Sequence, residues 1–412
     1  MSVAVTDPPS AAPASSSSLQ LAFITYMPVY RDSDRLYVHV ATGRVLDALA
    51  PYYRRVWLCA PVALQPPAAS ANPALEAYNV EVIAQPMYES TLQALLHPAR
   101  IIRAYWQVCS RADHVFVRGF CPYIEALYAC AAIRRRPVTH WLIGNPVGLL
   151  RSHRRAGRVK DLLSLLYALK DRAATKAGRA LAGGALVCNG LELGRVFASS
   201  RTVVAASSTV RDSEFFIRSD TCQGSVIHLL FVGYIRPEKG IEYLLEALAK
   251  LRLSRPWDLT IVGPEQQFSD YRARLERLIV QLGLGARVHW AGYVPFGPAL
   301  FAHMRRADIL VLPSLSEGTP HVLVESRANS LPAVATNVGG IPTTVRHEHD
   351  ALLVPPKDAD SIARAVERLV EDSLLRRRII ANGLASARLL TVDRFAALVR
   401  TSFQGRHHVE DR

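Results

Sequence analysis

The sequence predicts an α/β protein built from two doubly wound parallel sheets. First, short apolar runs alternate with longer segments of helical periodicity from Leu19 onward. Second, these runs are continuously apolar rather than alternating, which is typical of parallel strands covered by helices on both faces. Third, they form two series separated by a polar segment at 207–224, and 412 residues are enough for two domains.

The first series predicts seven strands with helices between them, such as those at 45–53 and 123–136. The strands are expected at LAFITYM, RVWLCAP, NVEVIAQP, HVFVRGF, VTHWLIG, GALVCNG and TVVAASS. They would form an N-terminal domain over residues 19–207. It would follow a tail at 1–18, whose Pro, Ala and Ser content is typical of disorder.

The second series predicts six strands, at VIHLLFVGY, DLTIVGP, RVHWAGY, DILVLPS, PAVATN and ALLVPP. Three helices are expected after them, at 358–372, 374–390 and 391–404. Thr391 is a natural N-cap for the last of these. We therefore expect a second domain over 208–385 and a closing helical segment over 386–412 that could pack back on the first domain.

Composition excludes several classes of protein. No window holds 18 uninterrupted apolar residues, so no membrane-spanning helix is expected. The N-terminus lacks the basic start and apolar run of a secretory signal. The six cysteines form no Cys-x-x-Cys pair and no zinc spacing, which favours buried, reduced thiols in a cytosolic protein. We expect a cytoplasmic location, with peripheral attachment to the inner face of the plasma membrane as an option.

The net charge of +14 is concentrated in one part of the chain, because residues 101–200 hold 16 Lys and Arg against 5 Asp and Glu. Such a field favours phosphates, nucleic acid or an anionic membrane. Nucleic-acid binding is not expected, since aromatic residues do not alternate with the arginines and no known module is present. Residues 151–180 carry the apolar run LLSLLYAL between basic residues. They are either a helix lying on anionic lipid or a core helix with a solvated basic face.

Charged residues and glycines follow three strands of the second series, where ligands bind in open parallel sheets. Arg236 and Lys239 follow the first strand, Glu317 follows the fourth, and Gly339 and Gly340 follow the fifth. Glycines let backbone amides approach an anion closely. Each residue alone could be an ordinary loop charge or turn, but their shared position at the ends of strands in one sheet favours a binding site.

Glu317 and Glu325 stand eight residues apart in the stretch SEGTPHVLVE. On one unbroken helix about 12 Å of axial rise and about 80° of turn would separate them. Pro320 argues against that helix, because proline suits the first helical position and disrupts the interior. We expect Glu317 on a loop and Glu325 on a helix that Pro320 opens. Cations and amides suit a diphosphate and carboxylates suit sugar hydroxyls, so the combination predicts a nucleotide sugar as ligand.

From about residue 226 to 370 the sequence closely resembles the donor-binding half of retaining GT-B glycosyltransferases of family 4. The matching stretches are FVGYIRPEKGIEYLLEAL, LTIVGP, RVHWAGYVP, ADILVLPSLSEGTPHVLVESRANSLPAVATNVGGIP and ALLVPP. The first half agrees mainly in strand order and in phrases such as VFVRG and RRPVTHW. The resemblance implies two Rossmann-like domains facing across a cleft, the first for the acceptor and the second for the donor.

By this resemblance Glu317 would face the hydroxyls of the donor sugar, with the backbone amides of Gly318 and Thr319 beside it. Glu325 would bind the ribose hydroxyls and Lys239 the diphosphate. Gly233, Gly339 and Gly340 are the remaining donor-side candidates.

One departure concerns the phosphate site, because many relatives have Gly-Arg where this chain has Gly233-Tyr234. Arg236 could take the place of that arginine.

The resemblance also implies transfer with retention at the anomeric carbon, with no cofactor and no protein-bound metal. The leaving diphosphate would accept the proton of the acceptor, and the protein would supply positioning and charge stabilisation. Asp-x-Asp occurs at Asp32/Asp34 and at Asp358/Asp360. The first pair is explained by a solvated loop and the second by the start of a helix.

Candidates in the first domain are fewer. Relatives often have a histidine after the fourth strand, where this chain has Arg118 and Gly119. His140 could face the cleft instead, or it could be a satisfied core residue. We list these three as acceptor-side candidates.

The sequence therefore favours a glycosyltransferase acting on a saccharide or lipid-linked acceptor in bacterial surface polysaccharide or glycolipid synthesis. A catalytically degenerate GT-B protein that binds nucleotide sugar as a scaffold subunit is the alternative. A nucleotide-sugar epimerase is disfavoured by the spacing of the two glutamates, and a nicotinamide dehydrogenase by the absence of G-x-G-x-x-G after any strand.

Overall fold

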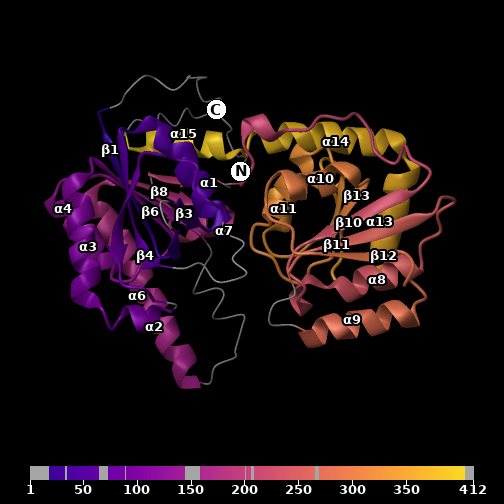
Figure 1. The fold of residues 1–412 in the computed structure, drawn as a ribbon, viewed down its shortest axis with the longest axis horizontal. Coiled ribbons are helices and arrows are strands. Elements are labelled where there is room, and N and C mark those ends of the chain that lie inside the picture. Colours follow the sequence, from indigo (N-terminus) through magenta and orange to yellow (C-terminus); the bar gives the residue numbers. More distant parts are fainter. Residues whose placement is uncertain are drawn as a thin grey trace. The chain divides into compact units, whose positions relative to one another are not determined.

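The computed structural model describes residues 18–32, 35–64, 73–88, 90–143, 158–199, 201–205, 208–264 and 269–403. Its contacts divide the chain into two compact units (Figure 1). The first unit comprises Met1–Ser207 and Val392–Arg412, and the second comprises Ser208–Thr391. The tail expected at 1–18 lies outside the described residues apart from Ser18.

The sheet of the first unit has the strand order β3-β2-β4-β1-β6-β7-β8-β9, with β5 paired to β4. All its pairs are parallel except β2 with β3. The strands are β1 (Gln20–Thr25), β2 (Val29–Asp32), β3 (Arg35–Val38), β4 (Arg55–Ala63), β5 (Val80–Gln85), β6 (His114–Arg118), β7 (Val138–Leu142), β8 (Gly184–Cys188) and β9 (Thr202–Val204). The seven predicted strands are confirmed. The hairpin of β2 and β3 was not predicted, because its short strands carry no continuous apolar run.

Helices cover both faces of this sheet. They are α1 (Val40–Leu49), η1 (Ala50–Tyr52), α2 (Thr91–Ala94), α3 (Pro98–Arg111), α4 (Ile124–Ile133), α6 (Arg158–Ala182), α7 (Leu191–Val196) and α15 (Val392–Ser402). Successive strand residues point to opposite faces. Val117 accordingly lies in the apolar core that α3 and α4 cover, and Phe116 in the core that α1 and α15 cover.

Helix α15 belongs to the first unit although the whole second unit precedes it in the sequence. Figure 1 shows it, in yellow, among the indigo elements of that unit. The ring of Phe395 lies 4.8 Å from that of Trp141 in β7, and the hydroxyls of Ser402 and Thr139 are 2.7 Å apart. These contacts make α15 part of the first unit's core.

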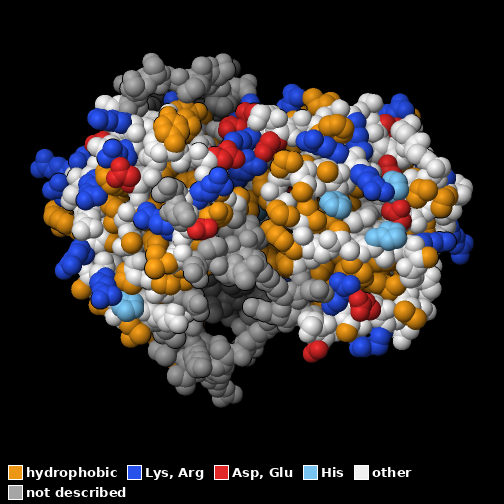
Figure 2. Space-filling model, in the orientation of Figure 1, with side chains coloured by type: hydrophobic (Ala, Val, Ile, Leu, Met, Phe, Trp, Pro, Cys, Tyr) orange, Lys and Arg blue, Asp and Glu red, His pale blue; other side chains and the backbone are white. Residues whose placement is uncertain are grey.

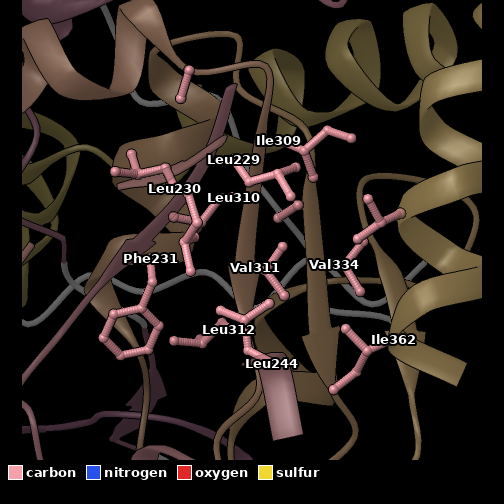
Figure 3. Packing of buried hydrophobic residues seen from close by; sticks show 14 of the residues in the cluster. Leu229, Leu230, Phe231, Leu244, Ile309, Leu310, Val311, Leu312, Val334 and Ile362 are labelled. Carbon is pink, nitrogen blue, oxygen red and sulfur yellow. The ribbon is translucent and has the colours of Figure 1, made fainter. Parts of the chain in front are cut away.

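The sheet of the second unit is entirely parallel in the described residues, with the order β12-β11-β10-β13-β14-β15. Its strands are β10 (Ile227–Val232), β11 (Trp257–Val262), β12 (Val288–Gly292), β13 (Ile309–Leu312), β14 (Ala333–Thr336) and β15 (Leu352–Val354). All six were predicted. Every residue of β13 and β14 is buried, which explains their continuous apolar character. Figure 3 shows β13 residues such as Val311 packed with Leu229 of β10 and Val334 of β14.

The helices of the second unit are η2 (Asp212–Glu214), η3 (Pro237–Lys239), α8 (Ile241–Ala249), α9 (Ser269–Gln281), α10 (Pro298–Arg306), α11 (His321–Ala328), α12 (Ile341–Thr344), α13 (Ala359–Glu371) and α14 (Ser373–Arg388). Asp358 caps α13 by accepting a hydrogen bond from the Ser361 N–H at 2.9 Å. As predicted, Glu317 lies in a loop and Pro320 opens the helix that carries Glu325, where it is the extended N-cap of α11.

A buried ion pair joins α11 to the turn before β15. Arg327 Nη1 lies 3.1 Å from Asp350 Oδ2, and each side chain is only 2% exposed. Asp350 also accepts hydrogen bonds from the Ser386 hydroxyl of α14 (2.8 Å) and from the Arg346 N–H (2.6 Å). One carboxylate therefore ties three segments together and fixes the position of α11.

Two further expectations can be compared with the structure. All six cysteines are free and buried, as predicted. In the described part of the chain, no helix is long and apolar enough to cross a membrane. Figure 2 shows Lys and Arg side chains at many points of the first unit's visible surface rather than in one patch.

Candidate functional site

Three loops of the second unit lie at the carboxyl ends of neighbouring strands, because β10, β13 and β14 are adjacent in the sheet. The loop after β10 contains η3 and Lys239, the loop after β13 contains Glu317, and the loop after β14 contains Gly339 and Gly340. From β10 the chain continues to β11 and β12 on one side of the sheet and then to β13, β14 and β15 on the other. Open α/β sheets bind ligands at such a switch point. The strand order thus places the predicted donor-side residues at one edge.

Lys239 and Glu317 form a close ion pair at this edge. Lys239 Nζ lies 2.5 Å from Glu317 Oε1, and the two side chains are 11% and 10% exposed. The Ser314 hydroxyl donates to the same carboxylate oxygen at 2.8 Å. Neither residue is therefore an ordinary solvated loop charge. A nearly dry cation held beside a carboxylate can bind both a phosphate oxygen and a hydroxyl group.

The glycine pair has a packing role that the sequence analysis did not foresee. A Cβ atom on Gly339 would lie 1.9 Å from Glu317 O, and one on Gly340 would lie 2.0 Å from Gly318 O. Gly339 also has a φ of +53°, and the Gly340 N–H donates to Glu317 O at 3.2 Å. Only glycine allows this approach. The pair presses the loop after β14 against the backbone of Glu317.

The η3 loop is tied to the same segment. A Cβ on Gly240 would lie 2.4 Å from Pro313 O, and the Leu315 N–H donates to Glu238 O at 2.8 Å. A Cβ on Gly233 would lie 3.7 Å from Lys239 Cε. Gly318, by contrast, faces open space. The three loops form one connected cluster in which the Gly318 backbone stays accessible.

Glu325 lies on the buried side of α11, and its Oε1 accepts a hydrogen bond from the Thr209 hydroxyl at 2.6 Å. The two glutamates thus have separate partners, since Glu317 bonds to Lys239 and Ser314. Sequence analysis missed Thr209, because a hydroxyl in a polar linking segment resembles any solvated residue.

Arg236 and Tyr234 form a more exposed group beside this cluster. The Arg236 guanidinium lies 5.4 Å from the centre of the Tyr234 ring, and its Nε is 4.0 Å from Glu238 Oε2. Tyr234 is 58% exposed. Arg236 is thus a surface cation over an aromatic ring, whereas Lys239 is buried.

His140 is completely buried in the first unit, and both its ring nitrogens are used. Nε2 donates to Gly119 O at 2.7 Å, and Nδ1 accepts from the Tyr128 hydroxyl at 2.9 Å. Burial lowers the pKa of His140 to about 4, so the imidazole is neutral near pH 7. Its observed contacts hold the Gly119 carbonyl in place.

Arg118 ends β6 and is 5% exposed. Its guanidinium lies 5.3 Å from the centre of the Trp141 ring in β7. Gly119 follows with a φ of +72°, and a Cβ there would lie 2.5 Å from the Tyr26 ring. Arg118 and Gly119 are thus enclosed by the residues that follow β1 and by β7.

The structure accounts for the second Asp-x-Asp sequence without a metal ion. Asp358 caps α13, and Asp360 pairs with Lys250 at 2.8 Å. Asp34 of the first sequence lies outside the described residues. Among the residues that are described, no group of three or more His, Cys, Asp or Glu side chains is placed to hold a metal ion.

Part of the basic segment 151–180 lies in α6, while residues 151–157 lie outside the described part of the chain. Leu162, Leu166 and Leu169 are 55%, 54% and 39% exposed. Their spacings of four and three place them on one face of the helix. Lys170 is engaged by Glu125 at 3.1 Å and Asp171 at 2.9 Å. The described residues of α6 thus expose these leucines together with Lys170 and Lys176.

The fold is that of the GT-B glycosyltransferases. The chain superposes on HepE from Anabaena in complex with UDP with a TM-score of 0.69 at 17% identity, covering 94% of this chain and all of that one. It superposes on sucrose-phosphate synthase from Thermosynechococcus elongatus with a TM-score of 0.66 at 19% identity, with the same coverage. At these identities the likeness concerns the fold.

Residues 214–385 match the family described as glycosyl transferases group 1. An uncharacterized glycosyltransferase from Methanocaldococcus jannaschii is 36% identical over 167 residues, 40% of this chain and 42% of the relative. The D-inositol 3-phosphate glycosyltransferase of Jonesia denitrificans is 32% identical over 180 residues, 42% of this chain and 41% of the relative. The similarity thus spans about two fifths of these relatives' length.

Proposed function

We propose that the protein is a retaining glycosyltransferase that moves a sugar from a nucleoside-diphosphate sugar to a hydroxyl of a saccharide or lipid-linked acceptor. The observation that carries this proposal is the nearly buried pair of Lys239 and Glu317 at the carboxyl ends of β10 and β13. At the ends of two neighbouring strands this pair offers a ligand a cation and a hydrogen-bond acceptor side by side. A sugar diphosphate offers anionic oxygens and hydroxyls side by side.

Lys239 would offset the negative charge that builds on the leaving diphosphate, together with the open backbone at Gly318. Glu317 would accept hydrogen bonds from hydroxyls of the donor sugar, and Glu325 from the ribose. With donor bound, the Lys239 ammonium would be shared between Glu317 and the diphosphate. The leaving phosphate oxygen would take the acceptor's proton on the face where the new bond forms, so the protein itself needs no general base there.

The comparisons support the donor class. HepE, which shares this fold, was solved in complex with UDP and with UDP-glucose. The relatives of this chain include an alpha-D-kanosaminyltransferase from Streptomyces kanamyceticus, 35% identical over 157 residues. A role in bacterial surface polysaccharide or glycolipid synthesis would suit an enzyme of this kind with a saccharide or lipid-linked acceptor.

The test is release of nucleoside diphosphate from a panel of nucleotide sugars, with and without lipid and saccharide acceptors. Glu317→Gln and Lys239→Ala should each lower turnover at least about 100-fold, because an interaction that strengthens in the transition state is lost. Asp360→Asn, which breaks an exposed ion pair of the same unit, is the matched control and should turn over like wild type. Full activity in Lys239→Ala would refute the assignment.

A catalytically degenerate binding subunit is the second candidate, favoured by the exposed Tyr234 where many relatives have arginine. A nucleotide sugar would then raise the melting temperature of the protein, yet no acceptor extract would produce turnover. Turnover with any acceptor excludes this candidate.

The exposed leucines of α6 support the proposal that the protein attaches peripherally to the cytoplasmic face of an anionic membrane. Vesicles containing anionic lipid should carry the protein upward in a density gradient. Leu166→Asp should abolish flotation and leave nucleotide binding unchanged. Equal flotation of Leu166→Asp would refute this part of the proposal, and Val280→Asp, on the exposed face of α9, is the control.

A further inference from the structure

The first unit holds buried hydrogen-bond donors for which the described residues supply no acceptor. Nε and Nη1 of Arg118 and Nε1 of Trp141 are buried and make no hydrogen bond. The guanidinium carbon lies 5.3 Å from the centre of the Trp141 ring, so the two side chains pack together. Buried polar groups are normally paired, and exceptions need a reason. All three atoms donate, so a group that satisfies them must be an acceptor.

These donors lie near the switch point of the first unit's sheet, where successive strands are added first on one side of β1 and then on the other. In the order β4-β1-β6-β7 the chain continues from β1 to β4 on one side and reaches β6 and β7 on the other. Thr25, Arg118 and Trp141 are register partners across the ends of β1, β6 and β7. Ligands of open parallel sheets bind beyond the strand ends at this point.

The charge of Arg118 is also uncompensated by the described residues. The described side chains that interact electrostatically with its guanidinium are those of Tyr26, which is also hydrogen-bonded to it, and Cys121. No carboxylate is among them. Burial raises the pKa of Cys121 well above neutrality, so this thiol carries no charge near pH 7. A buried water could accept hydrogen bonds, but it would leave the positive charge unbalanced. An anion would accept these hydrogen bonds and would also balance the positive charge.

We propose that Arg118 and the Trp141 indole N–H bind an anionic group, a phosphate or a carboxylate, carried by the sugar acceptor. The class of acceptor therefore narrows to phosphorylated or acidic saccharides and their lipid-linked forms. That the anion belongs to the acceptor rests on the proposed function, whereas anion binding at Arg118 does not. Tyr26, which is partly exposed, would lie at the mouth of this site.

The test is titration of the full chain with inorganic phosphate, glucuronate and neutral glucose, followed by tryptophan fluorescence. Phosphate, glucuronate or both should give a saturable change that glucose does not, and Trp141→Phe should remove most of that signal. Arg118→Met should weaken anion binding at least tenfold. Arg118→Lys keeps the charge but loses the guanidinium fork, so its affinity should be intermediate. Arg55→Met is the matched control, because Arg55 also lies 5.3 Å from a tryptophan ring, that of Trp57, in the same unit, and its charge is paired with Glu81.

A structural role for Arg118 would give a different pattern. If Arg118 only supported the fold, Arg118→Met would melt at a lower temperature. If it binds an anion, removal of an unpaired buried charge should leave the melting temperature unchanged or raise it. The stabilisation of the protein by UDP should be identical in wild type and Arg118→Met, because the donor site lies in the second unit.

Three results would overturn the proposal: no response to either anion, an unchanged response in Arg118→Met, or loss of the Arg118-dependent response to phosphate when UDP is added. The last would assign the anion to the donor. Absence of UDP binding in every variant, with the anion response intact, would instead refute the proposed function and leave the anion site standing. A response to phosphate but not glucuronate would identify the group as phosphate.

Discussion

The ion pair between Arg327 and Asp350 offers the sharpest test of how the second unit holds α11, the helix that carries Glu325. Asp350→Asn keeps the size of the side chain and one acceptor oxygen, which can still bond to the Arg346 N–H as Oδ1 does now. It replaces Oδ2, the oxygen that bonds to Arg327 and to the Ser386 hydroxyl, by an amide NH2 group and removes the charge that faces Arg327. The guanidinium, 2% exposed, would then be buried without a counter-ion.

The expected loss of stability follows from the geometry. At the observed 3.1 Å an ion pair in a medium of effective dielectric constant 20 contributes about 5 kcal/mol. Removal of one partner of a buried pair typically costs about 3–5 kcal/mol, because the other charge stays desolvated. A unit of roughly 180 residues loses about 2–4 °C of melting temperature per kcal/mol. Asp350→Asn should therefore lower the melting temperature of the second unit by about 6–20 °C.

The assay is scanning calorimetry of the full chain, fitted as two transitions because two units unfold. Only the transition that UDP raises should move. The double variant Arg327→Met with Asp350→Asn should recover most of the loss, since no charge is then left buried. Asp360→Asn, whose pair with Lys250 is half exposed, should leave the melting temperature of the second unit almost unchanged. An Asp350→Asn variant as stable as wild type would refute the reasoning. So would a double variant whose loss of stability exceeds the sum of the losses in the two single variants.

Three further predictions concern other parts of the molecule. Gly340→Ala should lower both donor affinity and the stability of the second unit, because its Cβ would lie only 2.0 Å from Gly318 O. Gly285→Ala is the control and should change neither property, because a Cβ there meets open space. Isothermal titration with UDP compares the donor affinities of the two variants. The neutral state of His140 should stabilise the first unit fully above pH 6.5 and progressively less as the pH falls from 6.5 towards 4, by about 3 kcal/mol. Urea unfolding at pH 7 and 4.5 measures this difference, which His140→Gln should remove; an equal pH dependence in both proteins contradicts it. Arg236→Ala should raise the donor KM several-fold with little change in kcat if this surface cation replaces the missing arginine, and steady-state kinetics with an unchanged KM would exclude that role.

Most of the fold could be predicted from the sequence, because buried parallel strands are unbroken apolar runs in the sequence. β13 and β14 are buried at every position and were predicted without difficulty. The β2–β3 hairpin shows the limit of that signal. Its strands are four residues long and half exposed, so its pattern is the same as that of a polar loop.

The candidate site could be predicted in outline, since the strand order of a doubly wound sheet decides which loops meet. The ion pair of Lys239 with Glu317 required coordinates, because two loops 78 residues apart must first be brought together. The role of Gly339 was missed for a related reason: the sequence shows that glycine permits close approach, but not which backbone approaches. The hydrogen bond of Thr209 to Glu325 spans 116 residues and leaves no periodic signal at either end.

The return of α15 to the first unit has a consequence for synthesis on the ribosome. The sheet of the first unit is translated before the second unit, yet the Trp141 face lacks its Phe395 cover until the residues after 391 have been translated. During that interval a nascent polypeptide would display an apolar face, while the intervening 208–391 segment is already able to collapse on its own core. The core of the first unit is therefore completed only after α15 has left the exit tunnel.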